Sequence, residues 1–185
     1  MLKDFSNLPV SGFLPEICSV VQKNKNCIVS AAPGAGKTML VPVALKEHFP
    51  GKVLLVEPRR IAAKGAASGI AAMQNFQLGS EVGFKVRGES MLKNDTGIVA
   101  VTCGMMLNIL QHDPELTGFE VIVFDEFHEL GAEQELIFAL LNEVREVFRE
   151  DLKVVIMSAT LDDEILQKLS DFLQYFRSVH DCCMQ

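Results

Sequence analysis

The sequence lacks the features that mark membrane-spanning and secreted proteins. No apolar run reaches the roughly 20 residues that a transmembrane helix needs, and residues 1–7 contain no apolar core of the kind found in signal peptides. The five cysteines are odd in number and scattered, without the spacing of metal ligands. These absences predict a cytoplasmic protein with reduced thiols.

The chain is also poor in basic residues. Its 17 Lys and Arg residues against 24 Asp and Glu residues give a net charge of −7, which excludes a uniformly basic nucleic-acid binder. The charge is unevenly distributed, however. Between Lys52 and Lys93 seven basic residues outnumber three acidic ones, whereas between Asp113 and Asp171 sixteen acidic residues outnumber four basic ones. The first of these stretches can therefore form a local basic face.

Length and composition favour one globular domain. The 185 residues are 49% hydrophobic and 22% charged, as is typical of a folded domain. Short apolar runs recur along the chain, and each is nearly continuous rather than alternating, as expected for strands buried on both faces of a parallel sheet. We predict strands at Cys27–Val29, Val53–Val56, Ile98–Val101, Val121–Phe124 and Val154–Met157.

Helical patterns separate these runs. The alternation of strand and helix predicts a three-layer, doubly wound α/β domain with a mainly parallel sheet. The stretch Gly79–Asp95 breaks this alternation, and we expect one short strand there, around Phe84–Val86. We predict helices at Lys37–His48, Arg60–Met73, Met105–Gln111, Ala132–Phe148 and Asp162–Tyr175.

A phosphate-binding loop is predicted where the first strand meets the first helix. The loop Ala31–Gly36 consists of small residues, and Lys37 and Thr38 open the helical pattern that follows. Gly34 and Gly36 lack a Cβ, so their backbone can approach a phosphate closely, and the helix N-terminus adds unpaired donors. The segment matches the P-loop pattern GxxxxGK[ST] except at Ala31. A Gly-rich turn that binds nothing is the alternative, but the strand–loop–helix context favours a nucleotide site.

The chemistry of this loop predicts individual roles. Lys37 is expected to reach the β- and γ-phosphates as a catalytic residue, and the Thr38 hydroxyl is expected to hold a magnesium ion. The predicted nucleotide-binding residues are Pro33, Gly34, Ala35, Gly36, Lys37 and Thr38.

Two carboxylates follow the apolar run Val121–Phe124. Because the carboxyl ends of parallel strands face the ligand crevice, we expect Asp125 and Glu126 near the P-loop. Asp125 suits magnesium, which prefers hard oxygen ligands, and Glu126 is a candidate catalytic base for the attacking water. An ordinary exposed loop after a strand is the alternative, which the upstream P-loop disfavours.

Further motifs lie between and beyond these two sites, in a fixed order. With them the chain resembles the DEAH-box members of helicase superfamily 2, and among these the bacterial HrpB-type helicases. Motif I corresponds to residues 31–38, and motif II to Asp125–His128, with Phe127 in place of the usual Ala. Motifs Ia, Ib and III correspond to Glu57–Ala63, Thr102–Leu107 and Ser158–Thr160, and Gly83–Arg87 is similar to the stretch between motifs Ia and Ib.

The resemblance implies a RecA-like domain that uses ATP and Mg²⁺ and contacts single-stranded RNA or DNA. Such contacts would go to phosphates and sugars without reading sequence. A solvated helix start is the plainer alternative for the two arginines involved. The implied nucleic-acid residues are Arg59, Arg60, Thr102 and Gly104.

The resemblance also implies residues that couple the two ligands. His128 would act with the catalytic residues, and Ser158 and Thr160 would link nucleotide state to strand binding. A structural hydrogen bond at His128 and a capping turn at Ser158–Thr160 are the alternatives.

Two departures from the family pattern affect the expected activity. Gly69 stands where related helicases often carry an Arg that can lie against the adenine. We also expect residues 1–161 to form the ATP-binding domain and residues 162–185 a helix and tail, without the family's second RecA-like domain. Since an arginine finger contributes about 10³–10⁵ in turnover, such a chain should bind nucleotide better than it hydrolyses it.

Three functions compete. The first is the motor domain of an ATP-dependent RNA or DNA helicase. The second is a stand-alone, nucleotide-gated nucleic-acid-binding module with little turnover. The third is an unrelated P-loop NTPase such as a small-molecule kinase, which would not need the motifs corresponding to Ia, Ib and III.

Overall fold

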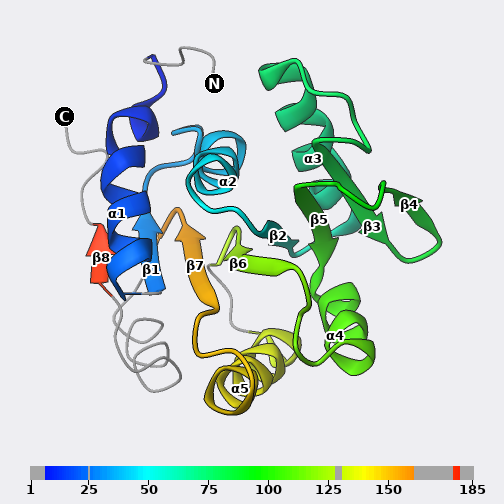
Figure 1. The fold of residues 1–185 in the computed structure, drawn as a ribbon. Helices are drawn as coiled ribbons and strands as arrows, with labels where there is room; N and C mark the ends of the chain where they lie inside the picture. The colour runs from blue at the N-terminus through cyan, green and yellow to red at the C-terminus, as the bar shows by residue number, and fades with distance from the viewer. Residues whose placement is uncertain (1–6, 25, 128–130, 161–176, 180–185) are drawn as a thin grey trace.

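One sheet runs through the centre of the molecule. The computed structural model describes residues 7–24, 26–127, 131–160 and 177–179 (Figure 1). Within them the sheet has eight strands in the order β4-β3-β5-β2-β6-β7-β1-β8, and every neighbouring pair is parallel except β3 with β4. The strands are β1 Asn26–Ser30, β2 Lys52–Glu57, β3 Val82–Val86, β4 Glu89–Met91, β5 Ile98–Thr102, β6 Phe119–Phe124, β7 Lys153–Ser158 and β8 Arg177–Val179.

Helices cover both faces of this sheet. The hydrophobic core is split accordingly, with α1, α2 and α3 over one face and α4 and α5 over the other (Figure 1). The helical elements are η1 Pro9–Phe13, α1 Leu14–Asn24, α2 Lys37–His48, α3 Arg60–Gln74, α4 Cys103–His112 and α5 Ala132–Val147. The predicted three-layer, doubly wound α/β fold is confirmed. No helix in the described ranges has the length and apolar character needed to cross a membrane.

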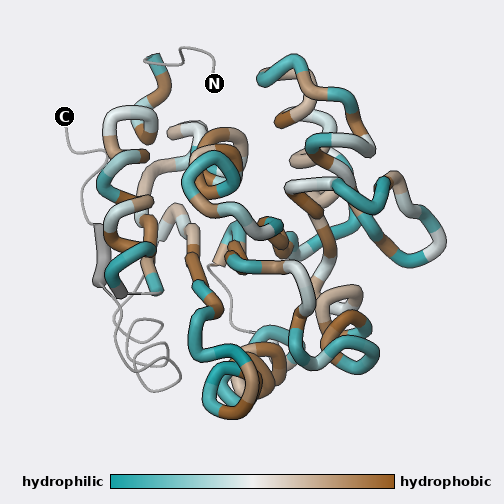
Figure 2. The backbone as a smooth tube through the Cα atoms, in the orientation of Figure 1, coloured by the Kyte–Doolittle hydropathy of each residue, from teal (hydrophilic) through white to brown (hydrophobic). Residues whose placement is uncertain are grey.

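The continuous apolar runs are explained by burial from two sides. Successive residues of a strand point to opposite faces, so Leu55 packs beneath α2 and α3 while Leu54 packs beneath α4 and α5. Both side chains are fully buried. Figure 2 shows the hydrophobic colouring along strands such as β5 and β7, between helices whose turns alternate in colour.

All five predicted strands form, each within one or two residues of its predicted bounds. The predicted helices at residues 37–48, 60–73, 105–111 and 132–148 also form. The third begins earlier, at Cys103, because the Thr102 hydroxyl accepts a hydrogen bond from the Met105 N–H at 3.4 Å and caps it. The helix predicted at Asp162–Tyr175 lies outside the described residues.

Four elements of the fold were not predicted, namely β4, β8, η1 and α1. The stretch Gly79–Asp95 holds two strands instead of one, because Gly88, at φ 81°, turns the chain back and lets β4 pair with β3. All three residues of β4 are exposed, so the strand has no alternating apolar pattern by which it could be found. The helices η1 and α1 were not predicted either, although the buried residues Ile17, Val20 and Val21 of α1 have helical spacing.

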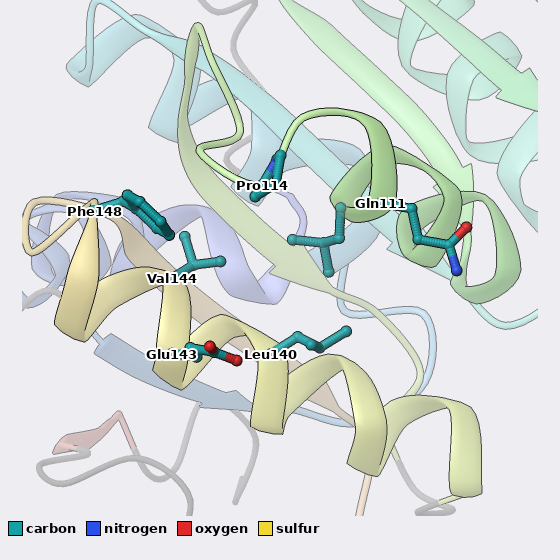
Figure 3. A pocket seen from close by; sticks show the side chains of 7 residues that line it. Gln111, Pro114, Leu140, Glu143, Val144 and Phe148 are labelled. Atoms are coloured by element: carbon teal, nitrogen blue, oxygen red, sulfur yellow. The ribbon is translucent and has the colours of Figure 1, made fainter.

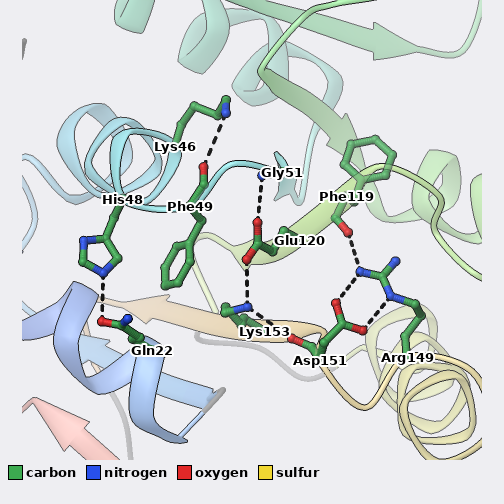
Figure 4. Close-up of polar contacts among 10 residues, drawn as sticks. All are labelled: Gln22, Lys46, His48, Phe49, Gly51, Phe119, Glu120, Arg149, Asp151 and Lys153. Carbon is green, nitrogen blue, oxygen red and sulfur yellow. Dashed lines mark hydrogen bonds and ion pairs between the residues drawn. The ribbon is translucent and has the colours of Figure 1, made fainter.

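Polar contacts fasten the amino ends of the central strands (Figure 4). Lys153 forms an ion pair with Glu120 at 3.0 Å, and Glu120 also accepts the Gly51 N–H at 2.7 Å. Arg149 pairs with Asp151 at 2.8 Å and donates to the Phe119 carbonyl at 2.9 Å. These contacts hold the amino ends of β2, β6 and β7 together.

Candidate nucleotide and nucleic-acid site

The loops that follow β1, β2, β5, β6 and β7 meet at the carboxyl edge of the sheet, where open α/β sheets bind ligands. Backbone hydrogen bonds hold three of these loops in register. Ala31 N–H donates to the Ser158 carbonyl at 3.2 Å, and Phe127 N–H donates to the Met157 carbonyl at 3.0 Å. The first residue of the P-loop and the segment after Asp125 are thus both hydrogen-bonded to β7.

The P-loop has a backbone that favours glycine. Gly34 and Gly36 have φ angles of 80° and 92°, which residues with a Cβ rarely adopt. A Cβ on Gly34 would meet nothing within 4 Å, so the loop is open there, whereas a Cβ on Gly36 would lie 3.0 Å from the Leu8 side chain. The loop also rests on η1, because Val10 N–H donates to the Ala35 carbonyl at 3.1 Å.

Lys37 lies inside the curve of this loop. Its side chain is buried, and its ammonium group donates to the carbonyl oxygens of Ala31 and, at 3.2 Å, Ala32. An ammonium group has three donors, so one remains for a ligand in the loop. The lysine therefore both shapes the P-loop and presents a positive charge within it.

The P-loop helix and the end of β6 are joined directly. The Thr38 hydroxyl donates a hydrogen bond to Asp125 Oδ2, and the Glu126 N–H donates to Asp125 Oδ1 at 2.8 Å. Asp125 is only 2% exposed. Burial raises the pKa of its carboxyl group, and the hydrogen bonds from Thr38 and Glu126 oppose that shift. Glu126 is exposed and adopts a φ of 51°.

These oxygen atoms fit a magnesium ion. A threonine hydroxyl and a carboxylate are hard oxygen ligands, and magnesium commonly takes one or two protein ligands together with substrate phosphates. Among the described residues no group of three or more His, Cys, Asp and Glu side chains is placed to hold a metal ion by itself. A cation at Thr38 and Asp125 would accordingly be shared with a bound phosphate.

Glu57 is a third carboxyl group at this site, and no role was predicted for it. It ends β2, is 2% exposed and lies close to Asp125. Burial, together with the negative charges of Asp125 and Glu126, raises the pKa of Glu57 to about 8. The sequence did contain a signal for Glu57. It directly follows the apolar run Val53–Val56, as Asp125 directly follows the run Val121–Phe124.

A groove of about 600 Å³ lies beside the nucleotide site. It is bounded by the start of α3, the turn between β3 and β4 and the start of α4, which lie together in Figure 1. Three of the four predicted nucleic-acid residues line it, namely Arg60, Thr102 and Gly104, together with Arg87 and Glu133, which were not predicted.

The fourth predicted residue, Arg59, is exposed and precedes α3 without lining this groove. Arg87 belongs to the groove because the turn after β3 lies next to α4. This long-range proximity cannot be inferred from local sequence. The nucleic-acid roles of the four predicted residues remain predictions.

The predicted coupling residues lie at the end of β7 and beyond. Ser158 is fully buried, and its hydroxyl donates to the Thr160 carbonyl at 2.6 Å. This contact forms a local turn, and the coupling role of both residues stays a prediction. His128 lies outside the described residues.

Phe127 and Gly69, the two positions that differ from the family pattern, both lie against other side chains. Phe127 is fully buried, and its ring packs edge-on against Phe138 of α5 with centroids 5.3 Å apart. A Cβ on Gly69 would lie 2.9 Å from the thioether of Met39, which occupies the neighbouring space. A larger residue at position 69 would therefore need Met39 to move.

Comparisons with known proteins show which family the chain resembles. The family model for DEAD/DEAH box helicases matches residues 14–169. The ATP-dependent RNA helicase HrpB of Escherichia coli (strain K12) is 39% identical over 166 residues, which cover 89% of this chain and 20% of that protein.

Two solved structures have the same fold. The crystal structure of the E. coli DExH-box NTPase HrpB has a TM-score of 0.86 at 38% identity, covering 95% of this chain and 22% of that one. A crystal structure of the Escherichia coli DEAH/RHA helicase HrpB has a TM-score of 0.83 at 37% identity, covering 92% and 22%. The chain thus spans about a fifth of the length of these relatives. On these matches, the chain belongs to the DEAD/DEAH box helicase family.

Proposed function

We propose that the chain is the ATP-binding motor domain of an ATP-dependent helicase, which hydrolyses Mg-ATP and couples this to movement along single-stranded RNA or DNA. The observation that carries the proposal is the hydrogen bond from Thr38 to Asp125, at a sheet edge that also opens into an arginine-lined groove. The name of HrpB, an ATP-dependent RNA helicase, supports this assignment.

The nucleotide binds with its phosphates against the loop 33–38. The open space at Gly34 admits a phosphate, and the first N–H groups of α2 face it. The remaining donor of Lys37 contacts the β- or γ-phosphate. Because Lys37 is already held by the Ala31 and Ala32 carbonyls, it loses little freedom on binding.

Hydrolysis uses the two acids after β6. Thr38 and Asp125 hold the magnesium ion, which neutralises charge on the phosphates when bound. Glu126 is exposed at the same edge and takes a proton from the attacking water. Asp125 is buried and hydrogen-bonded through both oxygens, so it is better suited to positioning than to proton transfer.

A single strand binds along the groove. Arg60 and Arg87 contact phosphates, which gives affinity without sequence preference. The Thr102 oxygen already accepts the Met105 N–H, so its hydroxyl hydrogen is free to be donated to the strand. Strand β2 connects the two sites, since Glu57 contacts Asp125 and the next residue, Pro58, lines the groove.

In this proposal residues 1–161 are one RecA-like domain. A second RecA-like domain, acting as a partner, supplies the other wall of the cleft and the arginine that stabilises the transition state. Turnover by residues 1–185 without such a partner is expected to be slow.

Substitution of Lys37 tests the nucleotide site. Lys37→Ala should weaken binding of a fluorescent ATP analogue about ten- to a hundredfold, the scale of a charged hydrogen bond. Lys46→Ala is the matched control, because Lys46 lies on the same helix and its ammonium also donates to backbone carbonyls, those of Phe49 and Pro50. Equal affinity of the two variants, with both folded, would exclude the P-loop assignment.

Strand binding is tested separately with a labelled oligonucleotide. Arg87→Ala should weaken binding for every sequence and reduce the slope of log affinity against log salt by about one. Lys93→Ala removes an exposed basic residue outside the groove and serves as the control. If Mg-ATP changes strand affinity but is never hydrolysed, the chain is instead a nucleotide-gated binding module.

A further inference from the structure

A second groove lies between the far ends of α4 and α5, on the sheet face opposite the P-loop helix (Figure 3). Its volume is about 330 Å³. Its lining is mainly apolar, and it comes from both helices and the residues just after them. The apolar lining residues of this α4–α5 groove are Leu110, Pro114, Leu140, Val144 and Phe148.

The groove continues into an apolar strip along α5. Leu136, Leu140, Val144 and Phe148 are spaced four residues apart, so they share one side of the helix. Five large hydrophobic side chains are exposed in the described part of the chain, and three of them are Leu136, Val147 and Phe148, at 51%, 63% and 54%. Exposed apolar surface gathered on one element marks an interaction site.

Acidic residues border this apolar surface. Glu143 lines the groove itself, Asp113 and Glu115 flank Pro114, and Glu146 is exposed on the next turn of α5. Between Met105 and Leu152 the sequence has only two basic residues, Arg145 and Arg149.

Neither arginine lines the groove. Arg149 is engaged by Asp151 and by the backbone carbonyls of Glu115, Leu116 and Phe119. Arg145 is half-buried, with its Nε inaccessible to solvent. The surroundings of the groove are thus negative, which disfavours nucleic acid and anionic lipid.

An apolar groove with acidic residues around it favours one kind of partner. An apolar groove between two helices fits the apolar side of a third helix, with anchors one turn apart. An acidic rim attracts a partner whose remaining side chains are Lys and Arg. A second copy of this chain would instead bring two acidic rims together.

We propose that the α4–α5 groove is a docking site for a basic amphipathic helix of another protein. The helix places Leu, Ile or Phe beside Phe148 and Leu140, and its Lys and Arg side chains lie against Glu143 and Glu146. Because the groove is on the opposite face from α2, the partner binds without obstructing the nucleotide. The proposal does not depend on the helicase activity.

A designed peptide provides the test. The probe is an amphipathic peptide with Leu at helical spacing and Lys elsewhere, and its counterpart carries Glu in place of Lys. The Lys peptide should bind the chain and the Glu peptide should not. Phe148→Ala should weaken the Lys peptide at least about tenfold, the scale of a central anchor residue. Phe148 is exposed, so this variant should keep its fold, which circular dichroism checks.

Two matched variants serve as controls. Met91→Ala removes another exposed hydrophobic side chain, on β4, and should bind the peptide as the wild type does. Glu143→Lys should weaken binding and lower its salt dependence, whereas Glu16→Lys, the same charge change on α1, should do so much less.

Three results would overturn the proposal. They are unchanged binding by Phe148→Ala, equal effects of Glu143→Lys and Glu16→Lys, or equal binding of the Glu peptide. A fourth contradicting result could come from analytical ultracentrifugation of the chain without peptide. A dimer that Phe148→Ala dissociates would show that the groove binds a second copy instead.

Discussion

The Thr38 hydroxyl donates a hydrogen bond to the Asp125 carboxylate, joining residues that are 87 positions apart in the sequence. It connects the first turn of α2 to the end of β6. With its hydrogen directed at Asp125, the hydroxyl oxygen keeps its lone pairs for another contact. The same geometry therefore orients Thr38 toward a cation, and it gives the buried carboxylate the donor it needs.

Removing this hydroxyl should affect magnesium more than nucleotide. Thr38→Val keeps the shape of the side chain, but it removes the donor to Asp125 Oδ2 and one of the two proposed metal ligands. We expect the gain in ATP-analogue affinity that magnesium gives over EDTA to fall about tenfold or more, while Thr38→Ser retains it. If the valine variant keeps the full magnesium effect, Thr38 is not a metal ligand.

Substitutions of Glu126 and Asp125 should have different effects, the first on ATP hydrolysis and the second on nucleotide binding. Glu126→Gln keeps the size of the side chain but cannot accept the proton, so hydrolysis should fall about a hundredfold or more with little change in ATP affinity. Asp125→Asn should instead weaken magnesium-dependent binding. Single-turnover hydrolysis with the protein in excess measures the first effect, even where turnover is slow. Wild-type hydrolysis by Glu126→Gln would assign the base elsewhere.

The fold was predictable because its strands are buried on both sides. Runs such as Val53–Val56 contain no polar position, since alternate residues enter different halves of the core. The P-loop could be located because strand, loop and helix are consecutive there. Packing across the sheet was not predictable. Phe127, for example, packs against both Phe124 and Phe138, which belong to different elements and also contact each other.

Two residues of the candidate sites, Glu57 and Arg87, were not predicted because the order of strands in a sheet cannot be inferred from local sequence. Glu57 contacts Asp125 because β2 and β6 are neighbours, although their sequences are far apart. Arg87 reaches the groove because β3 lies beside β5, whose end begins α4. The sequence indicates which residues end a strand, but the order of the strands in the sheet determines which other residues lie beside them.

Glu57 should make stability depend on pH. Its pKa of about 8 lies above the ordinary value of 4.5, so the folded state binds a proton that the unfolded state releases. Its contribution to stability is complete below about pH 4.5 and is lost as the pH rises through about 8. The slope from this one group is at most about 1.4 kcal/mol per pH unit. Asp125 shifts in the same direction, so the two titrate as a pair.

Replacement by glutamine removes this dependence. Without nucleotide or metal, Glu57→Gln should be more stable than the wild type near pH 8 and should lose that advantage near pH 5. Urea unfolding at several pH values measures the difference, and Glu115→Gln controls for replacing an exposed glutamate. A difference that stays constant with pH would mean that Glu57 is ionised in the folded protein.

The contact between Leu8 and Gly36 should couple η1 to the P-loop. Gly34→Ala and Gly36→Ala both place a Cβ on a left-handed backbone, at a cost of about 1–2 kcal/mol each. Only Gly36→Ala adds a clash, since its Cβ would lie 3.0 Å from Leu8 Cδ1. Gly36→Ala should therefore be the more destabilising of this matched pair in urea unfolding.

A double-mutant cycle isolates that clash. Leu8→Ala removes Cδ1 but keeps Cβ, which lies 3.2 Å from the added atom, so the relief is partial. Gly36→Ala should cost less in the Leu8→Ala protein than in the wild type, by at least about 0.5 kcal/mol, whereas Gly34→Ala should cost the same in both. Additive effects at Gly36 would mean that Leu8 moves aside freely. A measurable coupling would mean that the Leu8 side chain, just before η1, is held in place beside Gly36.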